Sequence, residues 1–165
     1  YHFDLQSTDS MTLIGTHFQA IGLGFPSAPG AIRGRKALGQ EPISVVVTGD
    51  GGGIMALADL DSVVRTATSA IVLVFNDACY GAEIHQYGSQ GLDEDIMEID
   101  EVNFAKIAEG FGAKGLVIQT LGDLHHVQEW VNSSAKGTVV ADLRISRKVV
   151  APYIEEIVEH TLKKK

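Results

Sequence analysis

The sequence has little cysteine, since Cys79 is the only one among 165 residues. A single thiol excludes an internal disulfide framework and any zinc site built from several cysteines. Basic residues are also scarce: 13 Lys and Arg stand against 21 Asp and Glu, which gives a formal net charge of −8. Beyond the terminal Lys163, Lys164 and Lys165, the sequence shows no basic patch that could neutralise the phosphates of a nucleic acid, so we expect no nucleic-acid binding.

Long hydrophobic runs are absent as well. No stretch of about 18 consecutive apolar residues occurs, so the sequence predicts no membrane-spanning helix. The opening residues lack the basic-then-apolar pattern of a secretory signal peptide, and we expect a cytoplasmic location. The chain begins with Tyr1 rather than Met. We interpret residues 1–165 as a single domain of a longer protein.

Glycine is what the sequence has in excess. There are 18 glycines, whereas an average protein has ~7% of this residue. The remaining composition, 45% hydrophobic and 21% charged, is that of an ordinary globular domain rather than a disordered or fibrous chain. In such a domain, extra glycine often marks places where the backbone approaches a ligand.

Short apolar runs predict the strands of the domain. Residues 43–48, 70–75 and 138–143 are nearly continuous apolar stretches, and residues 116–119 form a weaker fourth. Such runs are typical of strands that are buried on both faces of a parallel sheet.

Between these runs, apolar residues recur at spacings of three and four, which predicts helices. The helices are expected near Pro26, after Leu57, from Phe104 with Asn103 as N-cap, after Asp123 and after Pro152. The alternation of strands and helices predicts an α/β fold: a doubly wound, mainly parallel sheet flanked by helices on both faces. One acidic, aperiodic stretch, residues 88–101, is interpreted as a surface loop or lid.

Two predicted strands end in unusual segments, Gly49-Asp50-Gly51-Gly52-Gly53 and Asn76-Asp77-Ala78-Cys79-Tyr80-Gly81. Ligands of open α/β sheets bind at the carboxyl ends of strands, so neighbouring strands would bring Asp50 and Asp77 to one edge. Two carboxylates suit a hard cation such as Mg²⁺, and glycine N–H groups suit a phosphate. A helix from Ile54 onward would point its N-terminus there. On these residues alone, a simple strand-to-helix turn capped by Asp50 is an equal alternative.

The spacing of the two segments resembles a known cofactor motif. Gly51 and Asn76 are separated by 24 residues, and a Gly-Asp-Gly followed at this distance by Asn is the motif of thiamine diphosphate enzymes. Residues 18–26 and 103–112 also resemble stretches of the acetolactate synthase and pyruvate decarboxylase superfamily. Over residues 12–145, the chain is similar to the C-terminal, diphosphate-binding domain of that superfamily. The family's first strand of this domain would lie before Tyr1 or within residues 1–10.

The resemblance implies a set of Mg²⁺ ligands. Asp50 would bind the metal through its carboxylate, Asp77 would stand where the family generally has an Asn ligand, and Cys79 would offer its backbone carbonyl. Asp77 departs from the family by adding a negative charge beside the diphosphate. The alternative register makes Asn76 the ligand, and a reactive thiol is the alternative role for Cys79.

The resemblance also implies contacts with the thiamine diphosphate. The carbonyl of Gln19 would accept a hydrogen bond from the aminopyrimidine, and Ile21 would lie under the cofactor, although an ordinary core isoleucine is the alternative. The backbone of Gly51 and Gly52 would hold the diphosphate. The complete set of expected cofactor-binding residues is Gln19, Ile21, Gly49, Asp50, Gly51, Gly52, Asp77, Cys79, Tyr80 and Gly81.

The stretch after Gly81 enters the active site in the family. Acetolactate synthases carry apolar residues and a tryptophan there, whereas this chain has Glu83, His85 and Gln86. Glu83 or His85 would then serve as an acid, a base or a substrate anchor. The alternative is that both are solvated loop residues.

The resemblance implies half of an active site. A pyrimidine-binding domain of the same or a second chain would supply the other half, in a homodimer or tetramer that acts on a 2-keto acid as a decarboxylase or carboligase (a lyase or transferase). The chain alone would be inactive. The alternative is a non-catalytic phosphate-binding or dimerisation module of the same fold.

Overall fold

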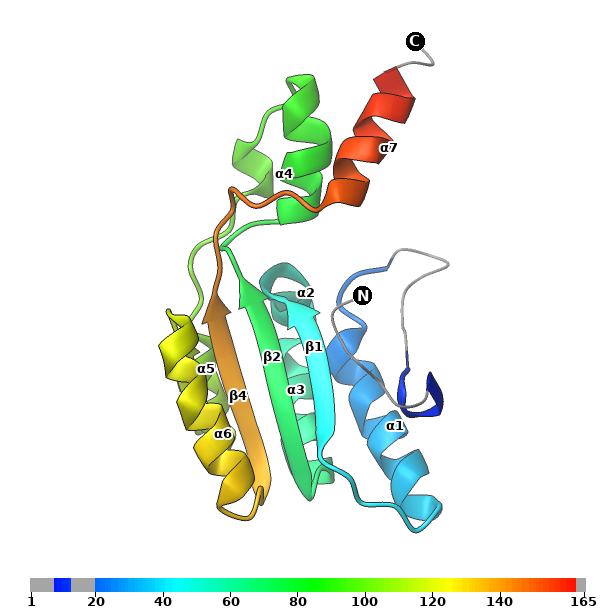
Figure 1. The fold of residues 1–165 in the computed structure, drawn as a ribbon, viewed down its shortest axis with the longest axis vertical. Coiled ribbons are helices and arrows are strands. Elements are labelled where there is room, and N and C mark those ends of the chain that lie inside the picture. The colour runs from blue at the N-terminus through cyan, green and yellow to red at the C-terminus, as the bar shows by residue number, and fades with distance from the viewer. Residues whose placement is uncertain (1–7, 13–19, 163–165) are drawn as a thin grey trace.

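Figure 1 shows the fold in a computed structural model, which describes residues 8–12 and 20–162. The described strands are β1 (Ser44–Gly49), β2 (Ser69–Asn76), β3 (Lys114–Ile118) and β4 (Gly137–Arg144). They form one sheet in the order β1-β2-β4-β3, and every pairing is parallel. The apolar runs therefore predicted all four strands to within two residues at each boundary.

Helices connect the strands, as the alternating pattern predicted. The Asn103 side chain caps α5 by accepting a hydrogen bond from the backbone N–H of Lys106 at 2.9 Å. The helix expected near Pro26 begins at Gly24, which leaves Pro26 in its first turn. The described helices are α1 (Gly24–Ala37), α2 (Asp50–Met55), α3 (Leu57–Thr66), α4 (Gly81–Tyr87), α5 (Phe104–Gly110), α6 (His125–Asn132) and α7 (Pro152–Leu162), with 3₁₀ turns at Thr8–Ser10, Gly88–Gln90, Asp95–Met97 and Leu121–Leu124.

The start of the helix after β1 differs from the prediction. We expected it from Ile54, but α2 already begins at Asp50 and includes the glycine run. Glycine occupies these positions of the helix because larger side chains would not fit: a Cβ at Gly53 would lie 3.1 Å from the ring of Phe104. The prediction was wrong because helix propensity penalises glycine, whereas close packing against α5 requires it.

One face of the sheet carries the main core. The aligned residues Val46, Val72 and Val140 lie on this face, in register across β1, β2 and β4. Helices α1, α3 and α5 cover them with side chains that include Phe25 and Phe104, both fully buried. The strand residues of this core are Val46, Val72, Val74 and Val140, so it lies under β1, β2 and β4.

The opposite face is covered over only part of its width. Trp130 of α6 packs there against Val139, next to the half-buried Ile71. Over β1 and β2, however, Val45 and Val47 are 53% and 44% exposed within the described part of the chain. Helices thus flank both faces, as predicted, but the second face is only half covered.

Gly115 in β3 provides a stability test of the packing between sheet and helix. A Cβ at this position would collide with the backbone of Ala105 in α5. We expect Gly115→Ala to destabilise the protein by about 2 kcal/mol, because a backbone segment must move. Gly34→Ala is the matched control, since an added Cβ on this exposed helix meets nothing within 4 Å. It should stabilise α1 by ~0.5–1 kcal/mol. The melting temperatures of both variants test this prediction. Equal melting temperatures would contradict the close packing of Gly115 against Ala105.

Candidate functional site

The carboxyl ends of β1 and β2 lie side by side, and both arrows in Figure 1 point toward α4. Gly49 at the end of β1 is aligned with Phe75 near the end of β2. Asp50 and Asp77 follow directly in the sequence, so the sheet brings their carboxylates to the same edge. The two carboxylates also interact electrostatically, since the charge of Asp77 acts to raise the pKa of Asp50.

Asp50 is a buried acid with an oxygen that has no partner. The residue is only 3% exposed. Oδ1 accepts a hydrogen bond from the N–H of Gly51 at 2.9 Å, whereas Oδ2 has no partner with hydrogen-bond geometry among the described groups, although the N–H of Ala78 is close enough to act to lower the pKa of Asp50. Burial is the main reason that the pKa of Asp50 is raised above its ordinary value, with Asp77 adding to it. A buried carboxylate oxygen beside a second carboxylate is a fitting ligand for a hard divalent cation.

Asp77 and Cys79 lie next to Asp50 in the turn after β2. A Cβ at Gly81 would lie 2.6 Å from Oδ2 of Asp77, so the carboxylate rests on the start of α4. Burial, followed by the hydrogen bond and charge of Asp77, raises the pKa of the Cys79 thiol to about 12. Cys79 therefore stays protonated at neutral pH, which argues against the reactive-thiol role.

The side chain of Asn76 is hydrogen-bonded to other parts of the protein. Its Nδ2 donates to the backbone carbonyl of Val102 at 2.9 Å and to Oδ1 of Asp142 at 2.8 Å. Its Oδ1 accepts a hydrogen bond from the N–H of Ala78 at 3.3 Å. Asn76 is buried and supports the turn after β2 through its hydrogen bond with Ala78. Asp77 instead lies at the edge of the sheet, beside Asp50.

Three of the site glycines pack closely against neighbours. A Cβ at Gly51 would lie 2.6 Å from Cε1 of Tyr80, and one at Gly52 would lie 3.3 Å from the backbone nitrogen of Gly22. Gly81 makes the close approach to Asp77 noted above. Close packing within the protein is therefore one reason for glycine here, in addition to the predicted approach of a phosphate. Gly49 is the exposed N-cap residue of α2.

Ile21 lies in a turn against α2. The following residue, Gly22, has a φ of +86°, and a Cβ there would lie 3.1 Å from Cβ of Met55. Ile21 itself is 50% exposed, so the alternative of an ordinary core isoleucine is wrong. Gln19 lies outside the described residues.

Glu83 and His85 lie on α4, so the alternative that they are loop residues is wrong, and both are half-buried. The Nε2–H of His85 donates to the backbone carbonyl of Arg147 at 2.7 Å. The helix was not predicted because residues 81–87 show no clear apolar period.

The stretch expected to form a loop or lid returns to the site. Residues 88–101 contain two 3₁₀ turns, and their end pairs with the turn after β2. Tyr80 donates its N–H to the carbonyl of Met97 at 2.8 Å, and Ile99 donates its N–H to the carbonyl of Ala78 at 3.1 Å. This end of the stretch is therefore attached to the site.

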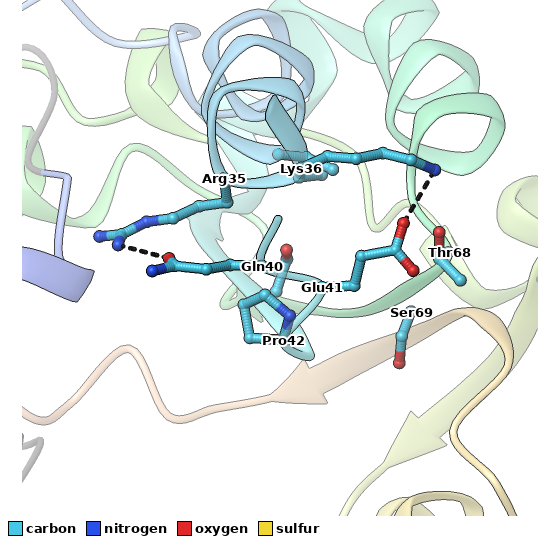
Figure 2. A pocket seen from close by; sticks show the side chains of 9 residues that line it. Arg35, Lys36, Gln40, Glu41, Pro42, Thr68 and Ser69 are labelled. Atoms are coloured by element: carbon cyan, nitrogen blue, oxygen red, sulfur yellow. Dashed lines mark hydrogen bonds and ion pairs between the residues drawn. The ribbon is translucent and has the colours of Figure 1, made fainter. Parts of the chain in front are cut away.

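A small hollow lies at the other end of the sheet, where β1 and β2 begin (Figure 2). It is bordered by an ion pair of 3.0 Å between Lys36 and Glu41 and a hydrogen bond of 3.1 Å from Arg35 to Gln40. With a volume of about 20 Å³, it has room for no more than a water molecule or two. The predicted chemistry therefore has no counterpart at this end.

The sequence matches the family described as "Thiamine pyrophosphate enzyme, C-terminal TPP binding domain" over residues 1–143. The chain belongs to this family. Thiamine pyrophosphate (TPP) is the same compound as thiamine diphosphate, so the resemblance seen in the sequence is confirmed. Residues 144–165 lie beyond the matched part of this TPP-binding domain.

Individual relatives agree with the family. The TPP-binding domain is 28% identical over 141 residues to an acetolactate synthase of Bacillus subtilis (strain 168), covering 85% of this chain and 24% of that protein. It is 24% identical over 123 residues to YdaP of the same organism, whose name describes it as thiamine pyrophosphate-containing, covering 74% of this chain and 21% of YdaP. The chain thus spans about a quarter of the length of these relatives.

Solved structures show the same fold. Benzoylformate decarboxylase from Polynucleobacter necessarius aligns with a TM-score of 0.69 and 23% identity, over 79% of this chain and 24% of that one. The 4-hydroxybenzoylformate decarboxylase of Rhodococcus jostii RHA1 aligns with a TM-score of 0.61 and 20% identity, over 76% and 23%. Separately, no helix in the described ranges combines the length and apolar character needed to cross a membrane.

Two residues at this edge carried no signal in the sequence. Asp142 receives the Asn76 side chain, and Arg147 contacts the turn after β2. Asp142 stands inside an apolar run, and Arg147 lies past the part of the chain that the family covers. Nothing in their local sequence distinguishes them, because both act on residues distant in the chain.

Proposed function

We propose that this domain binds Mg²⁺ and the diphosphate of thiamine diphosphate at the carboxyl ends of β1 and β2. The observation that carries the proposal is the buried, unpartnered Oδ2 of Asp50 next to a second carboxylate. A buried acceptor without a donor costs about 1–3 kcal/mol, which a bound cation would offset. The family supplies the identity of the cofactor, since its members bind thiamine pyrophosphate.

Within this proposal, Asp50, Asp77 and the backbone carbonyl of Cys79 ligate the metal. The hydrogen bonds of the Asn76 side chain favour Asp77 over Asn76, because they tie the amide to Val102, Asp142 and Ala78 within the protein. A carboxylate is also the stronger ligand for a hard cation than an amide. The extra negative charge of Asp77 then acts directly on the metal.

The backbone of Gly51 and Gly52 would face the diphosphate, together with the other cofactor-binding residues predicted from the sequence. The half-exposed Ile21 would offer an apolar surface to the thiamine. Thiamine supplies the electron sink for cleavage of a bond next to a carbonyl, while the protein binds and orients it and excludes water. Glu83 and His85, on α4 beyond the same edge, would contact the substrate or move a proton.

The proposal extends to the whole protein. We propose a 2-keto acid as substrate, a decarboxylase or carboligase activity, and a pyrimidine-binding domain of the same or a second chain that completes the site within a homodimer or tetramer. The cytoplasmic location stays a prediction. Because the domain would hold only half of the site, we expect it to be inactive when isolated.

Calorimetric titration of the full-length protein with thiamine diphosphate tests the function. We expect binding with Mg²⁺ present and at least tenfold weaker binding after chelation of divalent cations. Absence of binding under both conditions would favour the second candidate, a non-catalytic phosphate-binding or dimerisation module. Inorganic diphosphate serves as a competitor, since a pure phosphate site would bind it as tightly as the cofactor.

The assignment of the metal ligand has its own test. Asp77→Asn should keep thiamine diphosphate affinity at saturating Mg²⁺, because the amide oxygen still coordinates, while the affinity for Mg²⁺ itself weakens several-fold. Asp77→Ala should lose both. Mg²⁺ titrations at fixed thiamine diphosphate measure these effects. A silent Asp77→Ala, with a damaging Asn76→Ala in protein of unchanged melting temperature, would instead identify Asn76 as the ligand.

A further inference from the structure

The turn after β2, residues 77–80, contains a backbone conformation that needs support. Ala78 has a φ of +56°, in the left-handed region that non-glycine residues rarely adopt. Conformations of this kind persist only where the surrounding structure holds them. The proposed metal ligands, the carboxylate of Asp77 and the carbonyl of Cys79, flank Ala78 on either side.

Arg147 holds both peptide groups that meet at Ala78. Its Nε donates to the carbonyl of Asp77 at 2.5 Å, and its second terminal nitrogen donates to the carbonyl of Ala78 at 2.7 Å. Each peptide group is a rigid plane. Fixing two successive carbonyls therefore fixes the two dihedral angles of Ala78 between them, and with these the direction in which Asp77 and Cys79 face.

The guanidinium is itself held in place. The remaining terminal nitrogen donates to Oε1 of Glu98 at 2.7 Å, and the carbonyl of Arg147 accepts the Nε2–H of His85. Arg147 thus connects the turn, the end of residues 88–101 and α4. Its positive charge also reaches the turn, since it acts to lower the pKa of Cys79 against the larger effects of burial and Asp77.

We propose that Arg147 is a positioning residue for the metal-binding turn. The N–H donors of its planar guanidinium hold the carbonyls of Asp77 and Ala78 so that the Asp77 carboxylate and the Cys79 carbonyl face Asp50. This inference rests on the proposed function and extends it to the segment after β4. Because Arg147 lies beyond residues 1–143, the matched family region does not assign it a role. The geometry requires arginine, because lysine carries the same charge but lacks the planar group that donates to two carbonyls at once.

The test uses the full-length protein with three single substitutions. Arg147→Met removes both the positive charge and the guanidinium donors, whereas Arg147→Lys keeps the charge and removes only the guanidinium donors. Lys148→Met is the matched control, since it removes a neighbouring exposed positive charge. Thiamine diphosphate binding at saturating Mg²⁺ is measured by calorimetry. We expect Arg147→Met and Arg147→Lys each to weaken binding about tenfold, and Lys148→Met to leave it unchanged.

A second readout does not depend on the cofactor. The amides of Tyr80 and Ile99 donate to Met97 and to Ala78, so we expect their hydrogen exchange to accelerate at least tenfold in both Arg147 variants without ligand. Adding Ala78→Gly to Arg147→Met should restore part of the binding, because glycine adopts the left-handed conformation without strain.

Unchanged binding in Arg147→Met would overturn the inference, and so would wild-type binding in Arg147→Lys, which would show that charge alone matters. If the unsubstituted protein binds no thiamine diphosphate, the proposed function fails, and the exchange rates then decide the role of Arg147. Unaltered exchange at Tyr80 and Ile99 in that case would also reject it.

Discussion

Asp50→Asn should abolish Mg²⁺-dependent binding of thiamine diphosphate and at the same time stabilise the ligand-free protein. Binding is lost because the N–H of Gly51 holds Oδ1, so the substitution puts an amide nitrogen, which cannot ligate a cation, in place of the Oδ2 that we assign to the metal. Stability rises because the substitution removes a buried negative charge that lies beside Asp77 and has an unpartnered oxygen. Oδ1 of the variant still accepts from the N–H of Gly51, so this hydrogen bond is kept.

The extra stability of Asp50→Asn over the wild type should increase as the pH rises from acid to neutral. The folded-state pKa of Asp50 is raised above that of the unfolded chain. The charged form is therefore disfavoured in the fold, and the wild-type protein loses stability as the pH rises through the folded-state pKa. We expect Asp50→Asn to be more stable than the wild type by about 1–3 kcal/mol at neutral pH, and this difference should vanish in acid.

Melting temperatures of the full-length protein between pH 4 and 8, without divalent cations, measure the effect. Asp95→Asn, at an exposed residue of a 3₁₀ turn, is the control and should change neither stability nor binding. A variant that still bound thiamine diphosphate with normal Mg²⁺ dependence would reject Asp50 as a metal ligand. A variant less stable than the wild type at neutral pH would show that the buried charge is satisfied by groups within the protein.

Asp142→Ala should have the largest effect on stability. The Asp142 side chain is fully buried in β4 and accepts hydrogen bonds from the Asn76 side chain at 2.8 Å, the N–H of Phe104 at 3.0 Å and the Arg144 guanidinium at 2.8 Å. It therefore joins the end of β2, the start of α5 and the end of β4. Removing it takes the acceptor from the N–H of Phe104 and from one N–H of Asn76, and it leaves the half-buried Arg144 guanidinium with only Glu101 and the carbonyl of Val102.

Breaking a buried ion pair by removing one partner costs about 3–5 kcal/mol, a large part of the 5–15 kcal/mol that stabilises a typical domain. The melting temperature measures this loss, and hydrogen exchange at the Phe104 amide reports it locally. Thr138→Val in the same strand is the control, because the buried Oγ1 of Thr138 has no described partner. It should be neutral or stabilising. A mild effect of Asp142→Ala would mean that water satisfies the three donors.

The hydrogen bonds of Asp142 also support the turn that carries the proposed metal ligands. Asn76 is fixed to Asp142, and its Oδ1 accepts the N–H of Ala78. We therefore expect Asp142→Ala to weaken cofactor binding as well, through the turn rather than through the metal. In Asp50→Asn the binding is lost while the fold is strengthened, so the two variants separate a ligand from a supporting residue.

The local sequence determined much of this protein. The apolar runs predicted all four strands and the parallel sheet, because strands of parallel sheets typically carry apolar residues at nearly every position. They did not predict that one face over β1 would be left half exposed. Asn103 as a helix cap was also predictable, since capping depends on neighbours within one turn. The family followed from the Gly-Asp-Gly segment and its distance to Asn76, both of which are linear features.

Only the tertiary structure decided which of these residues meet. The order β1-β2-β4-β3 places Asp50 beside Asp77, binds Asn76 to Asp142 and brings Arg147 from beyond β4 onto the turn after β2. It also starts α2 at Asp50, where glycine packs against Phe104 despite its poor helix propensity. Periodicity and capping reflect contacts within a few residues, whereas these pairings join segments up to 70 residues apart. Such contacts arise from strand pairing and packing that no local pattern specifies.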